Sequence, residues 1–322
     1  MTIMKRWTAF LFAGLFGLLA MAGGVQAAER YKPYVLAWRG EGDAALFKDK
    51  VDEVRQNLAD AGFEIVTVFN PYAGSKVRVD GVDEARIVVF TSPAIRKVAT
   101  LTQYGAFAVP QRASVTRVGN DIQVAYYNPV YMAHAYRLKS DLSRTAERLA
   151  KVLGRIEEYG AKRGLTKRKL RKYHYTFGME YFDDVYKLAR YRNHEEAVKQ
   201  VAAHLANNDV GVSQVYRIDL PEKKQTLFGV RRNTLAVGGD KYADDAWILS
   251  NVDFEELKMT PYLPYEVLVD GKEVVALHMR FRMAVSRPSL RMMGKNSFMN
   301  LMPSPEAIRK VLTIAVGGEL ED

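Results

Sequence analysis

The feature that most constrains the fold of this chain is an order of elements that occurs twice. Apolar residues recur at helical spacing over residues 51–58 and again over 198–205, each time shortly before a strand-like run. Later in each half, two strand-like runs flank a two-residue turn, Gly119-Asn120 in the first half and Asp270-Gly271 in the second. A helix and a hairpin that return at nearly the same separation predict two tandem α+β units.

Each unit is expected to contain one antiparallel sheet covered by helices. In the first half, the predicted strands are 34–38, 63–69, 87–90, 107–118 and 122–127, and the predicted helices are 47–61, 93–101 and 141–154. In the second half, the predicted strands are 210–215, 247–249 (in the place of 87–90), 266–269 and 273–285, and the last helix is 303–316. The sequence therefore predicts the fold class α+β.

Residues 1–27 have the three parts of a secretory signal: a basic start, a short apolar stretch, and small residues that end at Ala27. No later stretch approaches the length of a transmembrane helix. We therefore expect a soluble protein that is periplasmic or secreted. The expected division is a signal peptide over 1–27, a first domain over 28–154, a basic linker over 155–178, and a second, divergent domain over 179–318.

The first half resembles a known family in four places. These are the helix-to-strand junction 58–63, the strand and proline-started helix over 87–95, Pro110 before the hairpin, and the end of the hairpin with its following proline over 124–129. In these motifs, roughly residues 45–135 are similar to the domain-of-unknown-function family 302. The resemblance implies an antiparallel sheet covered by helices, of the TATA-binding-protein-like β-α-β4-α type. The family has no agreed activity, so the resemblance implies a fold and no function.

The second half departs from the pattern of that family. Val252-Asp253 stand where Ser92-Pro93 are expected, and Arg280 stands opposite Pro129. The second unit is therefore predicted from internal similarity alone.

Several kinds of chemistry are absent from the sequence. The 322 residues include no cysteine, which excludes disulfides, thiolate metal sites and a cysteine nucleophile. Nucleophile-elbow, Walker-type and dinucleotide-binding glycine patterns do not occur. Asp253, Glu255 and Glu256 are typical of a solvated helix start and do not form an opposed catalytic pair. The sequence favours a protein without enzymatic activity, and a hydrolase of unrecognised type is an alternative.

The clearest charge feature lies between residues 162 and 172, in a chain whose formal net charge is +10. The residues predicted to contact an anionic ligand or a polyanion are Lys167, Arg168, Lys169, Arg171 and Lys172. Suitable partners are an anionic membrane surface or an acidic periplasmic protein. Nucleic acid is disfavoured because the usual recognition modules are missing. The alternative is a solvated linker that its own charges keep extended.

Methionines gather late in the chain and suggest a different site. Thioether sulfurs with an imidazole can hold Cu(I), so the candidate copper or haem ligands are Met292, Met293, Met299, Met302, His278 and His134. The alternative for the four methionines is a hydrophobic flap. Alternation along the predicted strand 273–285 instead places Met279 and Met283 in the core, with Arg282 on the wet face. The alternative for His134 is a satisfied buried histidine.

Together these patterns predict an exported tandem-domain binding or accessory protein. The groove between or within the two repeats is the expected place for an unidentified small ligand, because concave sites form where domains meet. The sequence contains 18 tyrosines, and a pocket lined by them suits an apolar or aromatic ligand. No cofactor is predicted by this interpretation. A periplasmic copper- or haem-binding protein associated with redox chemistry is the alternative.

Overall fold

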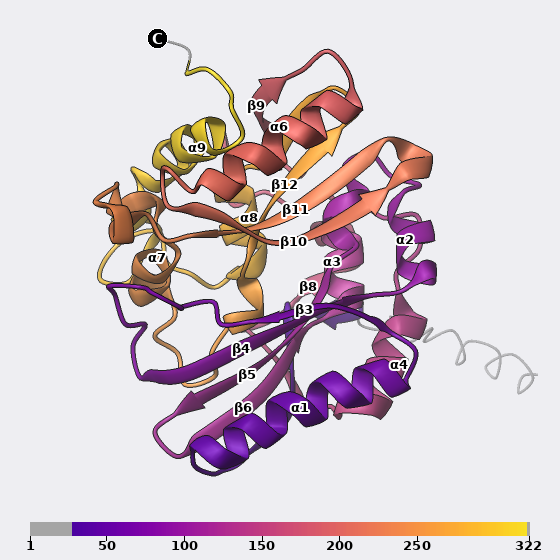
Figure 1. Cartoon of the computed structure of the whole chain (residues 1–322). Helices are drawn as coiled ribbons and strands as arrows, with labels where there is room; N and C mark the ends of the chain where they lie inside the picture. Colours follow the sequence, from indigo (N-terminus) through magenta and orange to yellow (C-terminus); the bar gives the residue numbers. More distant parts are fainter. Residues whose placement is uncertain (1–27, 321–322) are drawn as a thin grey trace, which may run out of the picture.

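Two large antiparallel sheets dominate the computed structural model, which describes residues 28–320 (Figure 1). The predicted signal over 1–27 lies outside the described residues. A third, two-stranded sheet pairs β1 (Arg30–Tyr31) with β8 (Leu165–Thr166). The mixed α+β class predicted from the sequence is confirmed. Among the described residues, no helix is both long and apolar enough to span a membrane.

The first sheet has six strands in the order β3-β4-β5-β6-β2-β7. Their bounds are Tyr34–Glu41 for β2, Glu64–Phe69 for β3, Val82–Thr91 for β4, Gln111–Val118 for β5, Asp121–Tyr127 for β6 and Glu157–Tyr159 for β7. Helix α1 (Ala44–Asp60) crosses β3, β4 and β5, and α4 (Ser143–Leu153) packs beside it. Two shorter helices, α2 (Pro93–Ala99) and α3 (Pro129–Ala135), follow β4 and β6.

Local sequence explains both ends of α1. The Asp43 carboxylate accepts hydrogen bonds from the backbone N–H groups of Ala45 and Leu46, which satisfies donors that the first turn leaves free. The chain leaves the helix at Gly62, whose φ of +73° is a conformation that glycine adopts without a side-chain clash. Between these ends, Phe47, Val54 and Leu58 are buried against the sheet.

The second sheet has five strands in the order β10-β11-β12-β13-β9. Their bounds are Val185–Arg190 for β9, Val212–Leu220 for β10, Gln225–Arg232 for β11, Tyr265–Asp270 for β12 and Glu273–Leu277 for β13. Helices α6 (His194–Asn207) and α9 (Ser304–Ala315) cover one face. Helix α7 (Asp245–Val252) lies in the connection from β11 to β12, and α8 (Met279–Ser286) follows β13.

The two sheets have the same topology over five strands. Along the chain, β2 and α1 come before β3 in the first half, and β9 and α6 come before β10 in the second. The strand order is β3-β4-β5-β6-β2 in the first sheet and correspondingly β10-β11-β12-β13-β9 in the second. In Figure 1, α1 and α4 lie outside the first sheet and α6 and α9 lie outside the second, so the inner faces of the sheets turn toward each other. Descent of both halves from one unit remains a prediction.

Two predicted strands are wrong. Residues 247–249 belong to α7, which the Asp244 carboxylate caps by accepting from the N–H of Trp247, and the strand in the place of 87–90 is β11. Val252-Asp253 therefore do not occupy the place of Ser92-Pro93. The predicted strand 273–285 ends at Leu277, because His278 caps a helix there by accepting from the N–H of Arg280.

The change from strand to helix also corrects which side chains face the interior. Met279 and Met283 are buried as predicted, but they lie one turn apart on α8 and not on one face of a strand. Arg282 was expected on a wet face and is buried. Asp253, expected at a solvated helix start, is buried as well.

The segment 155–178, predicted as a basic linker, contains several ordered elements. Strand β7 extends the first sheet beside β2, and β8 pairs with β1. Helix α5 (Lys167–Arg171) follows at once and packs against α3, with Leu170 buried.

Candidate functional site

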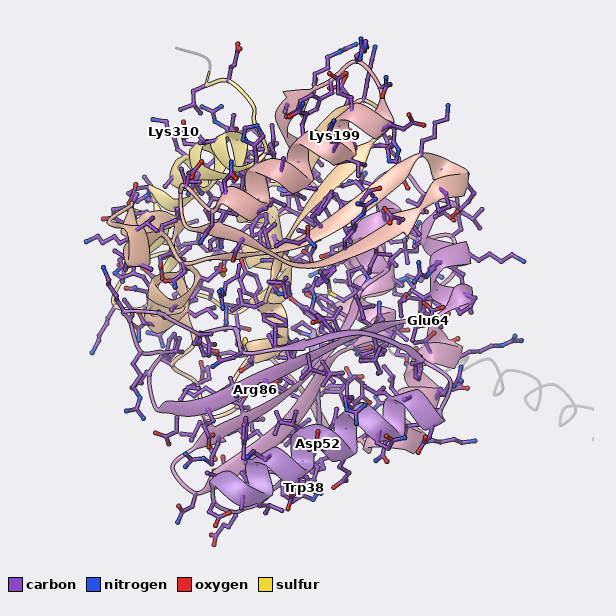
Figure 2. All side chains as sticks on the ribbon, viewed as in Figure 1. Trp38, Asp52, Glu64, Arg86, Lys199 and Lys310 are labelled. Atoms are coloured by element: carbon purple, nitrogen blue, oxygen red, sulfur yellow. The ribbon has the colours of Figure 1, made fainter. Side chains whose placement is uncertain are left out.

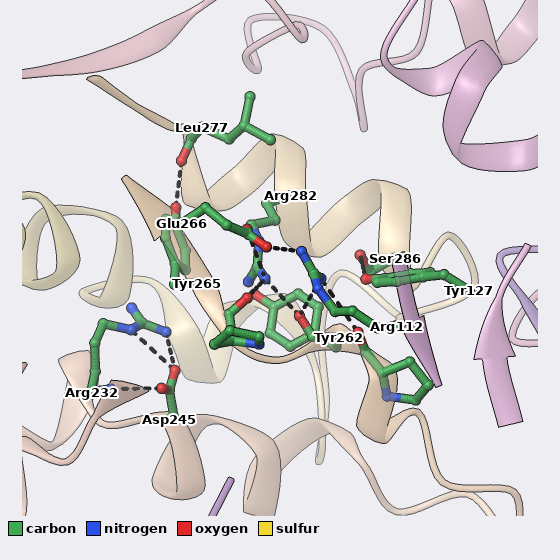
Figure 3. Close-up of polar contacts among 12 residues, drawn as sticks. Arg112, Tyr127, Arg232, Asp245, Tyr262, Tyr265, Glu266, Leu277, Arg282 and Ser286 are labelled. Atoms are coloured by element: carbon green, nitrogen blue, oxygen red, sulfur yellow. Dashed lines mark hydrogen bonds and ion pairs between the residues drawn. The ribbon is translucent and has the colours of Figure 1, made fainter. Parts of the chain in front are cut away.

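The inner faces of the two halves meet at a cluster of buried charges (Figure 3). Arg112 of β5 forms an ion pair with Glu266 of β12, and an Nη atom of Arg282, from α8, lies 3.5 Å from the same carboxylate. Glu266 is 2% exposed, and both arginines are buried as well. Since two guanidinium groups share one carboxylate, this cluster carries an excess positive charge in the interior.

Backbone carbonyls and tyrosine rings compensate that excess. Arg282 donates a hydrogen bond of 2.6 Å to the carbonyl oxygen of Tyr262, and its guanidinium lies 4.2 Å from the ring centroid of Tyr262 and 4.4 Å from that of Tyr265. Faces of aromatic rings attract cations, more strongly where water is excluded. Tyr262 belongs to a turn, Thr260–Tyr262, that leads into β12 of the second sheet and contacts β4, β5 and β6 of the first, so it connects the two halves.

Two further ion pairs are enclosed in the second half. Arg232 binds Asp245 at 2.5 Å through its side chain and at 2.8 Å through its backbone N–H (Figure 3). The Arg287 guanidinium lies 3.2 Å from the carboxylate of Asp253, and both side chains are buried. The Nε and Nη2 atoms of Arg287 have no hydrogen-bond partner in the described part of the chain.

Tyrosines surround the Arg287–Asp253 pair. Burial, followed by the charge of Asp253, raises the pKa of both Tyr72 and Tyr159, and burial raises the pKa of Tyr34 well above its ordinary value. These hydroxyls therefore stay neutral at physiological pH. Those of Tyr34 and Tyr72 have no partner among the described residues, so the environment of Arg287 is polar but not fully hydrogen-bonded.

A cavity of about 590 Å³ opens beside this pair, between the two halves. The first half contributes Lys32 and the residues of β7 and its following turn, 159–162. The second half contributes the segments 252–259 and 287–296 in part. The apolar lining residues are Tyr159, Ala161, Val252, Phe254, Leu257, Met259 and Leu290.

The charged residues of the lining are mostly cations. The cations are Lys32, Lys162, Arg287, Arg291 and Lys295, and the acids are Glu255 and Glu256. Glu256 is already paired with Arg39, at 2.5 Å. The lining therefore combines an apolar wall with an uncompensated positive charge, an arrangement that favours an anion with an apolar part.

A second cavity, of about 670 Å³, lies between α4 and the strands β2 and β6. Its charges are better balanced than those of the first cavity. Arg155 pairs with Glu158 at 2.7 Å, and Arg148 stacks on the ring of Phe63 at 4.6 Å. This cavity has no comparable excess of one charge.

The predicted basic residues lie at the surface. Lys167, Arg168, Lys169 and Lys172 are exposed. Arg171 is half-buried and donates hydrogen bonds to the carbonyls of Arg137 and Leu138, just beyond the last turn of α3. Four of the five side chains are therefore free to meet a partner, and the fifth holds the helix in place.

The only described contact between two of the predicted metal ligands is a backbone hydrogen bond between Met292 and Met299. Met293, Met299 and Met302 are exposed and Met292 is half-buried, in an irregular loop where the N–H of Met299 donates to the carbonyl of Met292. Within residues 28–320, no group of three or more histidine and acidic side chains is placed to hold a metal ion. Copper or haem ligation by the methionines stays a prediction.

The two candidate histidines have other contacts. His278 lies 3.2 Å from Glu180 and packs at a tilt against the ring of Tyr186, and burial lowers its pKa to about 4. His134 is buried against the ring of Tyr31, and burial lowers its pKa too. At neutral pH both histidines are therefore uncharged, and each packs against residues of its own half of the chain.

Sequence reasoning missed the residues that form the interior charge clusters. Arg112 and Glu266 each lie within an apolar strand of a predicted hairpin, and a charge at such a position is a detectable signal. The sequence around Asp253 does not mark it as a buried charge, because Asp253 stands in an acidic, polar stretch. Its partner Arg287 could not be identified without it.

Comparison with known proteins finds a family match for the first half of the chain. Residues 43–156 match the model of a family described as Domain of unknown function DUF302. The match runs from the N-cap of α1 to just beyond α4 and includes strands β3, β4, β5 and β6. The resemblance of the first half to this family is therefore confirmed. No curated protein matches the chain.

Proposed function

We propose that this chain is an exported binding protein that holds a small anionic ligand with an apolar part in the cavity between its two halves. The observation that carries the proposal is the cavity itself. Its volume of about 590 Å³ falls within the range of roughly 300–1,000 Å³ that small-molecule sites occupy. It lies where the halves meet, and both halves supply its walls.

The charge of the lining supports an anionic ligand. Five cations and two acids line the cavity. Arg287 is paired with Asp253, and Glu256 is paired with Arg39, which leaves four lining cations against Glu255. Next to the cavity, the buried cation Arg287 has a single carboxylate partner, and its Nε and Nη2 atoms, which are buried, have no hydrogen-bond partner among the described residues. An arginine keeps its charge at every physiological pH, so this positive potential is permanent.

The side chains of the lining support binding rather than catalysis. The hydroxyl of Ser289 accepts the backbone N–H of Lys162, and the hydroxyl of Tyr159 donates to the carbonyl of Lys258. Neither hydroxyl has a histidine or carboxylate base among its hydrogen-bond partners in the described chain, as an activated nucleophile would need.

Reversing two charges of the lining should weaken the binding of an anionic probe. We expect Lys162→Glu with Lys295→Glu to lower the affinity for anilinonaphthalene sulfonate by about tenfold or more, which corresponds to about 1.4 kcal/mol. Binding of the neutral probe phenylnaphthylamine should change little, because it depends on the apolar wall. The measurement is a fluorescence titration of each probe.

A matched control and a blocking variant complete the test. Lys199→Glu changes an exposed lysine on α6, outside the lining, and should leave both affinities unchanged (Figure 2). Ala161→Trp should block both probes, since it adds a large side chain to the lining. Equal affinities in all variants, at unchanged thermal stability, would place the probes elsewhere and contradict the proposal.

A further inference from the structure

Two surface segments of this chain carry cations and no acidic residue: 160–178 and 289–303. The exposed cations of the first segment lie within 162–163 and 167–172, and the second segment adds Arg291 and Lys295. Unmixed positive charge over two segments is unusual for a surface, because most surfaces mix both signs.

The two segments contact each other. The ring of Tyr175 packs on that of Phe298 at 4.6 Å between centroids, and the Tyr175 hydroxyl donates to the carbonyl of Leu290 at 2.7 Å. The backbone N–H of Lys162 donates to the hydroxyl of Ser289 at 2.9 Å. The two segments therefore lie side by side, and we call their exposed side chains together the basic face.

Large apolar side chains project from the same two segments. Phe177 is 99% exposed, and Met293 is 72% exposed. Met299 and Met302 are exposed too. Large apolar side chains that are exposed on touching segments are typical of a surface that meets a partner. The flanking lysines and arginines indicate that the partner is anionic.

We propose that the basic face docks on an anionic phospholipid bilayer, with Phe177 and Met293 inserted among the acyl chains below the headgroups. Cations attract anionic headgroups, while apolar side chains at the same depth gain from leaving water. A nucleic acid or an acidic protein would meet the cations equally well, but it would leave Phe177 and the methionines against phosphates or carboxylates. The chemistry of the mixed surface therefore favours a lipid.

Vesicle sedimentation of the full chain tests the electrostatic part. We expect retention on vesicles of phosphatidylcholine with phosphatidylglycerol, little retention on phosphatidylcholine alone, and loss of retention as salt rises. The variant Lys167→Glu, Arg168→Glu, Lys169→Glu should bind at least tenfold more weakly. The matched control Lys48→Glu, Lys97→Glu, Lys199→Glu changes three exposed lysines elsewhere and should bind far better than that variant. Equal loss in both variants would overturn the proposal.

Tryptophan fluorescence tests the insertion. With Phe177→Trp, emission should shift to shorter wavelength when anionic vesicles are added, because the indole leaves water. With Leu101→Trp, at an exposed position outside both segments, no shift of that kind should appear. Charge-dependent retention without a shift at position 177 would mean a polyanion contact without insertion and would overturn the proposal. None of the residues substituted here lines the cavity, so failure of this test leaves the proposed ligand binding untouched.

Discussion

Glu266→Gln is expected to lower the free energy of unfolding by about 3–5 kcal/mol, the cost of breaking a buried ion pair by removing one partner. The carboxylate of Glu266 is the shared counter-charge of Arg112 and Arg282, and all three side chains are buried. Glutamine keeps the shape but leaves two guanidinium groups in the interior without a negative partner. Because Arg112 belongs to the first sheet and Glu266 to the second, the loss should loosen the junction between the halves.

The same substitution at an exposed ion pair provides the control. Glu64 is 49% exposed and pairs with Arg96 at 2.6 Å, so Glu64→Gln should change stability by less than about 1 kcal/mol (Figure 2). Urea denaturation followed by circular dichroism measures both variants. Equal stability of the two variants would show that the interior cluster does not hold the halves together.

Met279→Ala is expected to destabilise the protein by about 2–5 kcal/mol, because it leaves a cavity in a close-packed interior. Met279 and Met283 are fully buried, one turn apart on α8. Met302→Ala, in the exposed methionine loop, removes the same atoms from a side chain that packs little. It should cost much less than Met279→Ala.

Thermal unfolding of both methionine variants gives the comparison. A loss for Met302→Ala as large as that for Met279→Ala would mean that the loop methionines support the fold. Stoichiometric copper bound to the unmutated protein, and lost when two of the loop methionines are replaced, would instead support the copper alternative.

Local signals predicted the first half well. The helical spacing that ends before Gly62 and the turn at Gly119-Asn120 each depend on neighbouring residues, and helix α1 and the hairpin of β5 and β6 that they predict are present. The order of strands in the second sheet also follows the first, as the recurring helix and hairpin suggested. Such signals need no knowledge of the tertiary structure.

The errors arose where a short apolar run allows two conformations. The run at 247–249 suits a buried strand or a buried helix, and the Asp244 cap selects the helix. The alternation over 277–283 suggested a strand, yet the cap at His278 begins a helix whose sides are all largely buried. In both cases the segment is buried on most sides. The spacing of its apolar residues therefore does not show which face is exposed to solvent.

The candidate site depends on contacts that sequence order does not show. Arg112 and Glu266 come from different sheets, and Arg287 meets Asp253 across a helix and a hairpin. A groove between the halves was predicted as the place for a ligand, but not which residues line it. Of the basic residues from Lys167 to Lys172, four are exposed and Arg171 is half-buried, and contact of these residues with an anionic partner stays a prediction.

Native mass spectrometry of the full chain, purified gently from its own cells, tests the proposed ligand binding most directly. We expect a bound small organic anion with an apolar part on the unmutated protein, and its loss from Ala161→Trp, in which the cavity between the halves is filled. The same amount of bound compound on both proteins, with equal thermal stability, would contradict the assignment of the cavity as the ligand site.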